Sequence, residues 1–89
     1  MTFKNATFPT PLYMVWDDDE EVFDGVLVGI TDIDTEADRC VLLVDELMPQ
    51  TARLKVPYSL IDASAIHLET GVHLFLDAAE VEQWKSENK

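Results

Sequence analysis

The chain has 89 residues, which is enough for one small domain and excludes two independent ones. Hydrophobic residues make up 47% of the sequence and charged residues 27%, a composition that supports a folded core and differs from that of a disordered chain. The 18 acidic and 6 basic residues give a formal net charge of -12. This charge argues against direct nucleic-acid binding and against anionic membranes, because both contacts depend on Lys and Arg.

Residues 1–11 show neither the two-residue period of a strand nor the 3.6-residue period of a helix. We expect an N-terminal arm that either frays or is anchored by Phe3 and Phe8 on this domain or on a neighbouring subunit. Apolar residues alternate from Leu12 to Trp16, which predicts the first strand. Residues 12–89 are interpreted as a single β-barrel domain.

Residues 22–33 have the pattern of a long strand with apolar side chains on both faces. Gly25 and Gly29, four positions apart, indicate bends or bulges at which this strand turns a corner, and favour a closed or nearly closed small barrel. We expect its core-facing residues to be Val26, Val28 and Ile30. A fully apolar short strand is predicted at residues 40–44, a strand of alternating apolar and polar residues at 51–57, and a single helical turn within residues 58–64.

Residues 66–76 predict a β-hairpin. The apolar residues of its two arms share one face only if Leu68 pairs with Val72. That pairing requires a three-residue loop, in which Gly71 supplies the positive φ of the bulge position.

A helix is predicted over residues 78–86. Asp77 and Glu80 have the spacing of an N-cap residue and its capping-box partner. Val81 and Trp84 share one helix face, which we expect to pack on the barrel mouth or edge. The expected fold is all-β, or β-rich α+β: a five- or six-stranded SH3-like barrel with one C-terminal helix, with an open α+β sheet as the alternative.

Five stretches carry a family resemblance: VWDDD at 15–19, GITDIDT at 29–35, RCVLLV at 39–44, VPYSLI at 56–61 and LFLD at 74–77. In this order they resemble PRC-barrel domains, a family of small β-barrels, over about residues 12–85. The resemblance implies a non-catalytic binding module, because the family includes domains that attach to photosynthetic reaction centres and to ribosomal assembly intermediates. It implies no catalytic residues.

Carboxylates recur at every second position of one turn: Asp32, Asp34, Glu36 and Asp38. This spacing is that of the start of a calcium loop, in which alternate oxygens converge on one ion. However, Ala37 stands where the loop needs glycine, and Leu43 where it needs a bidentate glutamate. We therefore expect a solvated hairpin turn, with a weak ion site as the alternative.

His67 and His73 face each other across the predicted hairpin, on the side away from Ile66 and Leu74. Paired strand residues have Cβ atoms about 4.5–5.5 Å apart, close enough for two imidazoles to share a metal ion or a proton. Two ligands are fewer than a structural zinc site needs. We expect an exposed pair beside Phe75, with a weak metal site or a pH-dependent interface as alternatives.

A dense acidic surface is predicted near the first turn: Asp17, Asp18, Asp19, Glu20, Glu21 and Asp24. We interpret residues 17–21 as a turn, since five adjacent carboxylates cannot share a buried face. This surface either keeps the protein soluble or imitates a phosphate backbone.

Nothing in the sequence points to catalysis or to a cofactor. No serine lies in a Gly-flanked elbow, the three glycines form no phosphate loop, and no metalloprotease or paired-cysteine motif occurs. Cys40 is the only cysteine, so an intrachain disulfide is impossible, and its apolar flanks predict a buried, inert thiol. With no apolar run long enough for a signal peptide or membrane span, we expect a cytoplasmic protein.

The function we expect is that of a non-enzymatic acidic protein-binding module, forming a homodimer through an exposed strand edge or the aromatic arm. The alternative is an acidic inhibitor that imitates nucleic acid and binds a basic DNA- or RNA-binding protein. The aromatic residues expected at a contact surface are Tyr13, Tyr58 and Phe75, with Phe3 and Phe8 of the arm.

Overall fold

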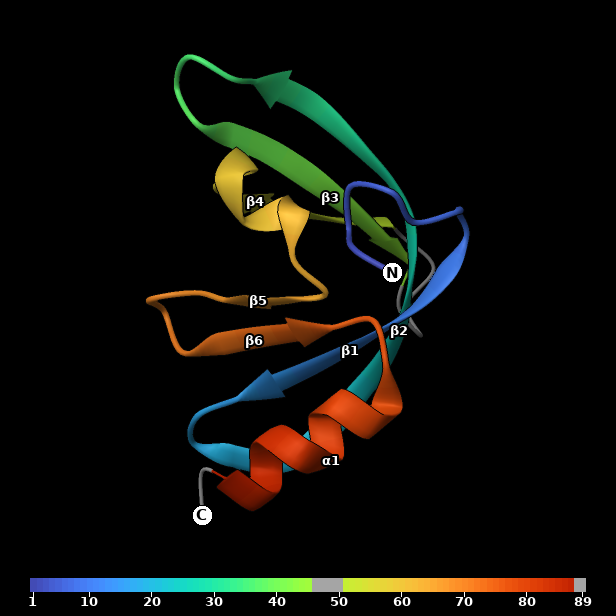
Figure 1. Ribbon diagram of the computed structural model, residues 1–89, viewed down its shortest axis with the longest axis vertical. Coiled ribbons are helices and arrows are strands. Elements are labelled where there is room, and N and C mark those ends of the chain that lie inside the picture. The colour runs from blue at the N-terminus through green and yellow to red at the C-terminus, as the bar shows by residue number, and fades with distance from the viewer. Residues whose placement is uncertain (46–50, 88–89) are drawn as a thin grey trace.

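The computed structural model describes residues 1–45 and 51–87, with Asp19 and Glu20 described by their backbone alone. Its elements are β1 (Thr10–Trp16), β2 (Asp19–Asp34), β3 (Arg39–Asp45), β4 (Thr51–Val56), the 3-10 helix η1 (Tyr58–Asp62), β5 (Ala65–His67), β6 (Val72–Phe75) and α1 (Ala78–Glu87). The six strands form one antiparallel sheet in the order β4-β3-β2-β1-β6-β5 (Figure 1). The expected small β-rich fold with one C-terminal helix is confirmed.

The sheet is open, because β4 and β5 lie at its two ends and do not pair with each other. Pro57 ends β4, since proline has no N–H to donate to a ladder, and the chain then forms η1. η1 contacts both β3 and β5, so a helical turn lies where a closed barrel would continue as strand (Figure 1). The expectation of barrel closure is corrected by this arrangement.

β2 turns the corner of the sheet, since its first half pairs with β1 and its second half with β3. A register shift between Leu27 and Gly29 marks the β-bulge that the glycine spacing predicts. The bulge exchanges the two faces of the strand: Leu27 is fully buried, whereas Val26 is 39% exposed. Of the three residues expected in the core, Ile30 packs against it. The prediction was wrong for Val26 and Val28, which belong to neither core.

The main core lies on the inner face of the bent sheet. It contains Leu12 and Met14 from β1 together with residues of β2 to β6, and the alternation of β1 is therefore confirmed. A second, smaller core of Val15, Phe75 and Val81 lies between the outer face and α1. The helix thus covers a face of the sheet, which corrects the expectation that it packs on the barrel mouth or edge.

The N-terminal arm is anchored on its own domain. Phe3 is fully buried in the main core, and Phe8 packs against that core. The Phe3 N–H donates to the carbonyl of Ala63 (3.1 Å) and the Lys4 N–H to that of Ile61 (2.8 Å). The arm therefore pairs with the chain around η1, and of the alternatives left open, anchoring on this domain is the one observed.

The β5–β6 hairpin has the predicted register. Ile66 lies opposite Leu74, and the Leu68 N–H donates to the carbonyl of Val72 (2.9 Å). Gly71 has a φ of 87°, as the three-residue loop requires. The argument from apolar parity is confirmed.

The start of α1 is capped by Asp77, whose Oδ1 accepts a hydrogen bond from the Ala79 N–H (2.9 Å). The Glu80 carboxylate does not complete a capping box; its Oε1 accepts a hydrogen bond from the Ser64 hydroxyl (2.8 Å). The N-cap prediction is confirmed, and Glu80 connects α1 to the segment before β5.

Candidate functional site

His67 and His73 form the cross-strand pair that the hairpin register predicts. Their Nδ1 atoms are 2.8 Å apart, and their ring centroids are 5.0 Å apart. The His73 side chain is 12% exposed, whereas His67 is exposed. The pair therefore has one fixed ring and one accessible ring.

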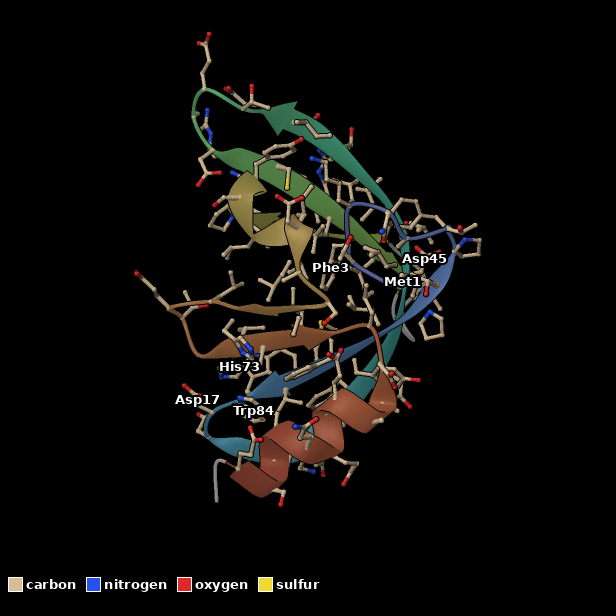
Figure 2. All side chains as sticks on the ribbon, in the orientation of Figure 1. Met1, Phe3, Asp17, Asp45, His73 and Trp84 are labelled. Carbon is tan, nitrogen blue, oxygen red and sulfur yellow. The ribbon has the colours of Figure 1, made fainter. Side chains whose placement is uncertain are left out.

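Asp17 and Trp84 hold the His73 ring from two sides (Figure 2). Asp17 Oδ1 lies 2.5 Å from His73 Nε2, and the Trp84 and His73 ring centroids are 4.4 Å apart. The Asp17 N–H also donates to the carbonyl of Gly71 (3.0 Å), which ties the β1–β2 turn to the β5–β6 loop. Sequence reasoning missed these partners because nothing local in the sequence relates Asp17 to a histidine 56 positions away.

The hydrogen bonds assign the protons of the pair. A carboxylate only accepts, so His73 donates from Nε2 to Asp17, and in its neutral form its Nδ1 is an acceptor. His67 then donates from Nδ1, which leaves only its own Nε2 free of these contacts. Burial, and secondarily the charge of His73, lower the pKa of His67. The neutral pair therefore holds one proton between its two Nδ1 atoms.

An aromatic pair lies on the β1–β2 hairpin, next to the turn that contains Asp17. Trp16 and Phe23 make an edge-to-face contact with ring centroids 5.0 Å apart and an interplanar angle of 86°. Phe23 is 41% exposed, and Trp16 is half-buried. Neither residue was expected at a contact surface; the signal that could have found them is an acidic run flanked by two aromatic residues.

The acidic run is only partly a turn. Asp17 and Asp18 form the two-residue connection, and β2 already begins at Asp19, which pairs with Trp16. The expectation of a turn over residues 17–21 is corrected, because a strand needs only one buried face and an exposed hairpin end tolerates charge on both. The described carboxylates of the predicted acidic surface are exposed: Asp17, Asp18, Glu21 and Asp24.

The aromatic residues expected at a contact surface are less accessible than the sequence suggests. Phe3 is 0% and Phe75 2% exposed, so both belong to the cores of this chain, which corrects their assignment as contact residues. Phe75 is covered by α1, and Phe3 is held by the backbone pairing of the arm. Phe8, Tyr13 and Tyr58 are half-buried against the two cores.

The carboxylates of residues 32–38 do not converge. They make separate contacts: Asp32 with Arg53, Asp34 with the Ala37 N–H and Arg39, and Asp38 with the N–H and hydroxyl of Ser59. The Ala37 N–H lowers the pKa of Asp34. In the described parts of the chain, no group of three or more His, Cys, Asp and Glu side chains could hold a metal ion. The calcium-loop alternative is corrected by this separation of the oxygens.

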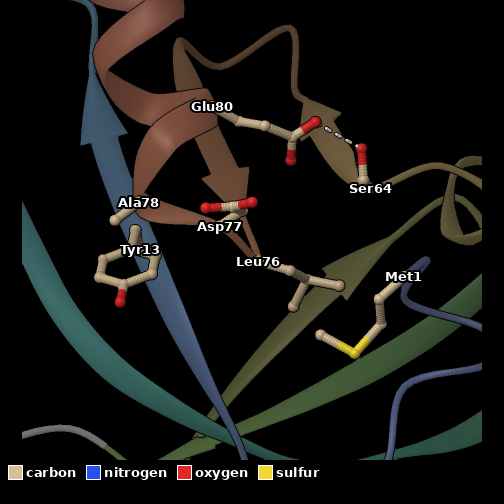
Figure 3. A pocket seen from close by; sticks show the side chains of 7 residues that line it. All are labelled: Met1, Tyr13, Ser64, Leu76, Asp77, Ala78 and Glu80. Atoms are coloured by element: carbon tan, nitrogen blue, oxygen red, sulfur yellow. Dashed lines mark hydrogen bonds between the residues drawn. The ribbon is translucent and has the colours of Figure 1, made fainter.

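A pocket of about 430 Å³ lies beside the start of α1 (Figure 3). Its lining residues are Met1, Tyr13, Ser64, Leu76, Asp77, Ala78 and Glu80. Glu80 Oε2 is buried and has no hydrogen-bond partner among the described residues, while Oε1 binds Ser64. The Glu80 carboxylate therefore connects α1 to Ser64, the residue before β5.

Cys40 is 1% exposed on β3, and burial together with the charge of Asp38 raises the pKa of its thiol. The buried position of the thiol is as predicted. Among residues 1–45 and 51–87, no helix has the length and apolar character needed to cross a membrane.

Comparisons with known proteins add no relative: neither a family model, a curated protein nor a solved structure matches this chain. The resemblance to PRC-barrel domains stays a prediction.

Proposed function

We propose that the chain is a non-enzymatic acidic protein-binding module that binds a basic segment of a partner protein at the end of the β1–β2 hairpin. The proposed contact, called here the hairpin surface, consists of Trp16, Asp17, Asp18, Glu21, Phe23 and Asp24. The observation that carries the proposal is an aromatic pair with an exposed member, Phe23, next to a run of carboxylates.

The aromatic pair gives the hairpin surface its apolar anchor. Binding energy in protein interfaces concentrates on a few residues, among which Trp and Tyr are enriched, surrounded by contacts that exclude water. Phe23 leaves 41% of its surface accessible, and its ring packs edge-to-face with that of Trp16. A Lys or Arg side chain of the partner can lie on the face of such a ring, where the interaction contributes about 0.5–1 kcal/mol at an exposed site.

The charge of the molecule supports a basic partner. Three of the basic side chains are paired with aspartates, in Lys4–Asp62, Arg39–Asp34 and Arg53–Asp32. The protein as a whole has a net charge of -12, and the described carboxylates of the hairpin surface, those of Asp17, Asp18, Glu21 and Asp24, belong to exposed residues. This field attracts a basic partner and raises its rate of encounter, with an effect that salt screens.

The alternative function, imitation of nucleic acid, is favoured by one observation. β2 begins at Asp19, so the acidic run continues along a strand. A strand repeats its residues at about 3.3 Å, which gives charged positions a regular spacing. The partner would then be a DNA- or RNA-binding protein, and double-stranded DNA would compete for it.

Affinity capture from a cell lysate with matched variants tests the proposal. Phe23→Thr removes the exposed ring and keeps a residue that favours strands. Ile33→Thr is the control, because Ile33 is a 53% exposed apolar residue at the other end of the same strand. We expect basic proteins to be captured by the wild type and by Ile33→Thr, and to be lost with Phe23→Thr.

Salt and a competitor separate the two functions. Under the proposal, part of the captured set survives at high salt through the aromatic contact, and DNA does not displace it. Loss of the whole set at high salt, together with displacement by DNA, supports the nucleic-acid mimic. Equal capture by Phe23→Thr and the wild type, or a captured set without basic proteins, contradicts the hairpin surface as the binding site.

A further inference from the structure

We propose that His67 and His73 form a bidentate site for a transition-metal ion of the zinc and copper class, with Asp17 as the outer residue that orients His73. This histidine site does not depend on the function proposed above. Imidazole nitrogen is a preferred ligand of Zn²⁺, Cu²⁺ and Ni²⁺, whereas Ca²⁺ and Mg²⁺ prefer oxygen ligands.

The two ligand atoms already face each other. Their Nδ1–Nδ1 distance is 2.8 Å. A metal ion bound at the usual 2.0–2.1 Å from each nitrogen separates tetrahedral ligands by about 3.3 Å, so a small outward rotation of one ring admits the ion. His67 is the exposed ring, so we assign the rotation to it, while His73 is held between Asp17 and Trp84.

Asp17 orients His73 as a metal ligand before any ion binds. In protein metal sites a ligating histidine almost always donates its other ring N–H to a carboxylate, a carbonyl or water, which fixes the tautomer and increases its basicity. Asp17 Oδ1 receives that bond from His73 Nε2 and thereby leaves the Nδ1 lone pair toward His67. The carboxylate also places a negative charge close to the ion.

The surroundings of the pair limit the number of ligands that this chain supplies. The rings of Phe75 and Trp84 lie beside His67, with centroids 5.7 and 6.4 Å from that of the imidazole. No third metal-ligating side chain joins the two histidines in the described residues. Water or a group from a bound partner therefore completes the coordination, and the site is an open chelate, unlike a closed structural zinc site.

Binding exchanges the shared proton for the ion. The metal takes the lone pairs of both Nδ1 atoms, so the proton that His67 donates from Nδ1 must leave that atom. It is transferred through water to Nε2 of His67, or it is released when Nε2 already carries a proton. His73 keeps its proton on Nε2, bound to Asp17.

Trp84 provides a direct test, because bound Cu²⁺ quenches the fluorescence of a tryptophan that lies close to it. The measurement uses Trp16→Phe as the parent protein, which leaves Trp84 as its only tryptophan. Excess Mg²⁺ is present so that it occupies the carboxylates. We expect saturable quenching by Cu²⁺ that Zn²⁺, which does not quench, reverses by competition, and Cu²⁺ binding tighter than Zn²⁺.

Variants in the same parent assign the ligands. His67→Gln removes an exposed ligand, and we expect it to weaken Cu²⁺ binding by at least about 10-fold. Asp17→Asn is expected to weaken it by about 10–100-fold, the usual effect of removing an outer carboxylate. Asp18→Asn removes the same charge from the neighbouring exposed turn position and is expected to leave the affinity unchanged.

Three outcomes overturn the histidine site: quenching that His67→Gln does not weaken, equal effects of Asp17→Asn and Asp18→Asn, and failure of Zn²⁺ to reverse the quenching. Far-UV circular dichroism checks that each variant is folded. Phe23→Thr is expected to bind Cu²⁺ normally, so failure of the hairpin surface and failure of the histidine site give different results.

Discussion

Gly71 occupies a position in the β5–β6 loop that strongly favours glycine. Its φ is 87°, and a Cβ added there would lie 2.9 Å from Asp17 Oδ2. We expect Gly71→Ala to destabilise the protein by about 1–3 kcal/mol, measured by urea unfolding, because it combines backbone strain with displacement of the Asp17 carboxylate. Gly29→Ala is the control, since its Cβ would meet only Leu43 at 4.0 Å, and an equal loss in both variants would contradict the assignment.

A second prediction at the scale of one residue concerns the buried thiol of Cys40. Because burial, and secondarily the charge of Asp38, raise the pKa of this thiol above its ordinary value, the folded state keeps its proton at pH values where the unfolded chain loses it. This contribution to stability is complete below about pH 9 and is lost as pH rises toward the folded pKa. We expect native Cys40 to resist iodoacetamide until denaturant is added; rapid labelling of the folded protein would contradict burial of the thiol.

The residues of the histidine site show how far sequence reasoning reaches. The His67–His73 pairing follows from apolar parity, because one choice of loop length places all the apolar residues of the hairpin on one face. Asp17 and Trp84 were not predictable in the same way. They meet His73 through the pairing of β1 with β6 and the packing of α1, and local sequence patterns contain neither.

At the scale of the element, the N-terminus of α1 depends on a single side chain. Asp77 accepts a hydrogen bond from the Ala79 N–H, which would otherwise have no partner within the helix. We expect Asp77→Ala to lower stability by about 1 kcal/mol and Asp77→Asn to retain most of it, because asparagine is also a good N-cap residue. Thermal unfolding of the two variants provides the measurement. Equal melting temperatures for Asp77→Ala and the wild type would show that the cap contributes nothing.

β2 shows why an element can be predicted while its faces are not. Its length and its two glycines indicate a bent strand, and the structure has one from Asp19 to Asp34. A bulge adds one residue and thereby exchanges the inward and outward faces, yet the glycine spacing leaves its position uncertain by a residue or two. The core prediction therefore places Val26 inside, where the structure has Leu27. Closure of the sheet could not be predicted from the sequence either. It depends on whether the residues after Pro57 form a strand or a helical turn, and the structure has the helical turn.

At the scale of the whole molecule, the open sheet leaves β4 as its longer free edge. β5 has three residues and β4 has six, and in the described structure β4 pairs with β3 alone. Of the two contacts expected for a homodimer, the strand edge is favoured over the arm, because Phe3 of the arm is buried in its own domain. An edge-to-edge contact between two copies of β4 is therefore the form of homodimer that we propose.

Charge opposes this contact in two ways. Each copy carries a net charge of -12, and an antiparallel pairing centred on Leu54 places Arg53 of one copy opposite Lys55 of the other. Like charges directly opposite each other across strands are destabilising. We expect the mass from light scattering to rise from 10.1 kDa toward twice that value as protein and salt concentrations increase, since salt screens both repulsions.

Lys55→Glu tests the register of the homodimer. It turns both Arg53–Lys55 oppositions into opposite-charge pairs, so it should favour the dimer at low salt even though it makes each copy more acidic. Glu69→Gln, a change on an exposed loop away from β4, lowers the overall repulsion without altering the edge. A dimer strengthened by Lys55→Glu more than by Glu69→Gln identifies β4 as the contact. A mass that stays at 10.1 kDa for all three proteins, at every concentration and salt, excludes the homodimer.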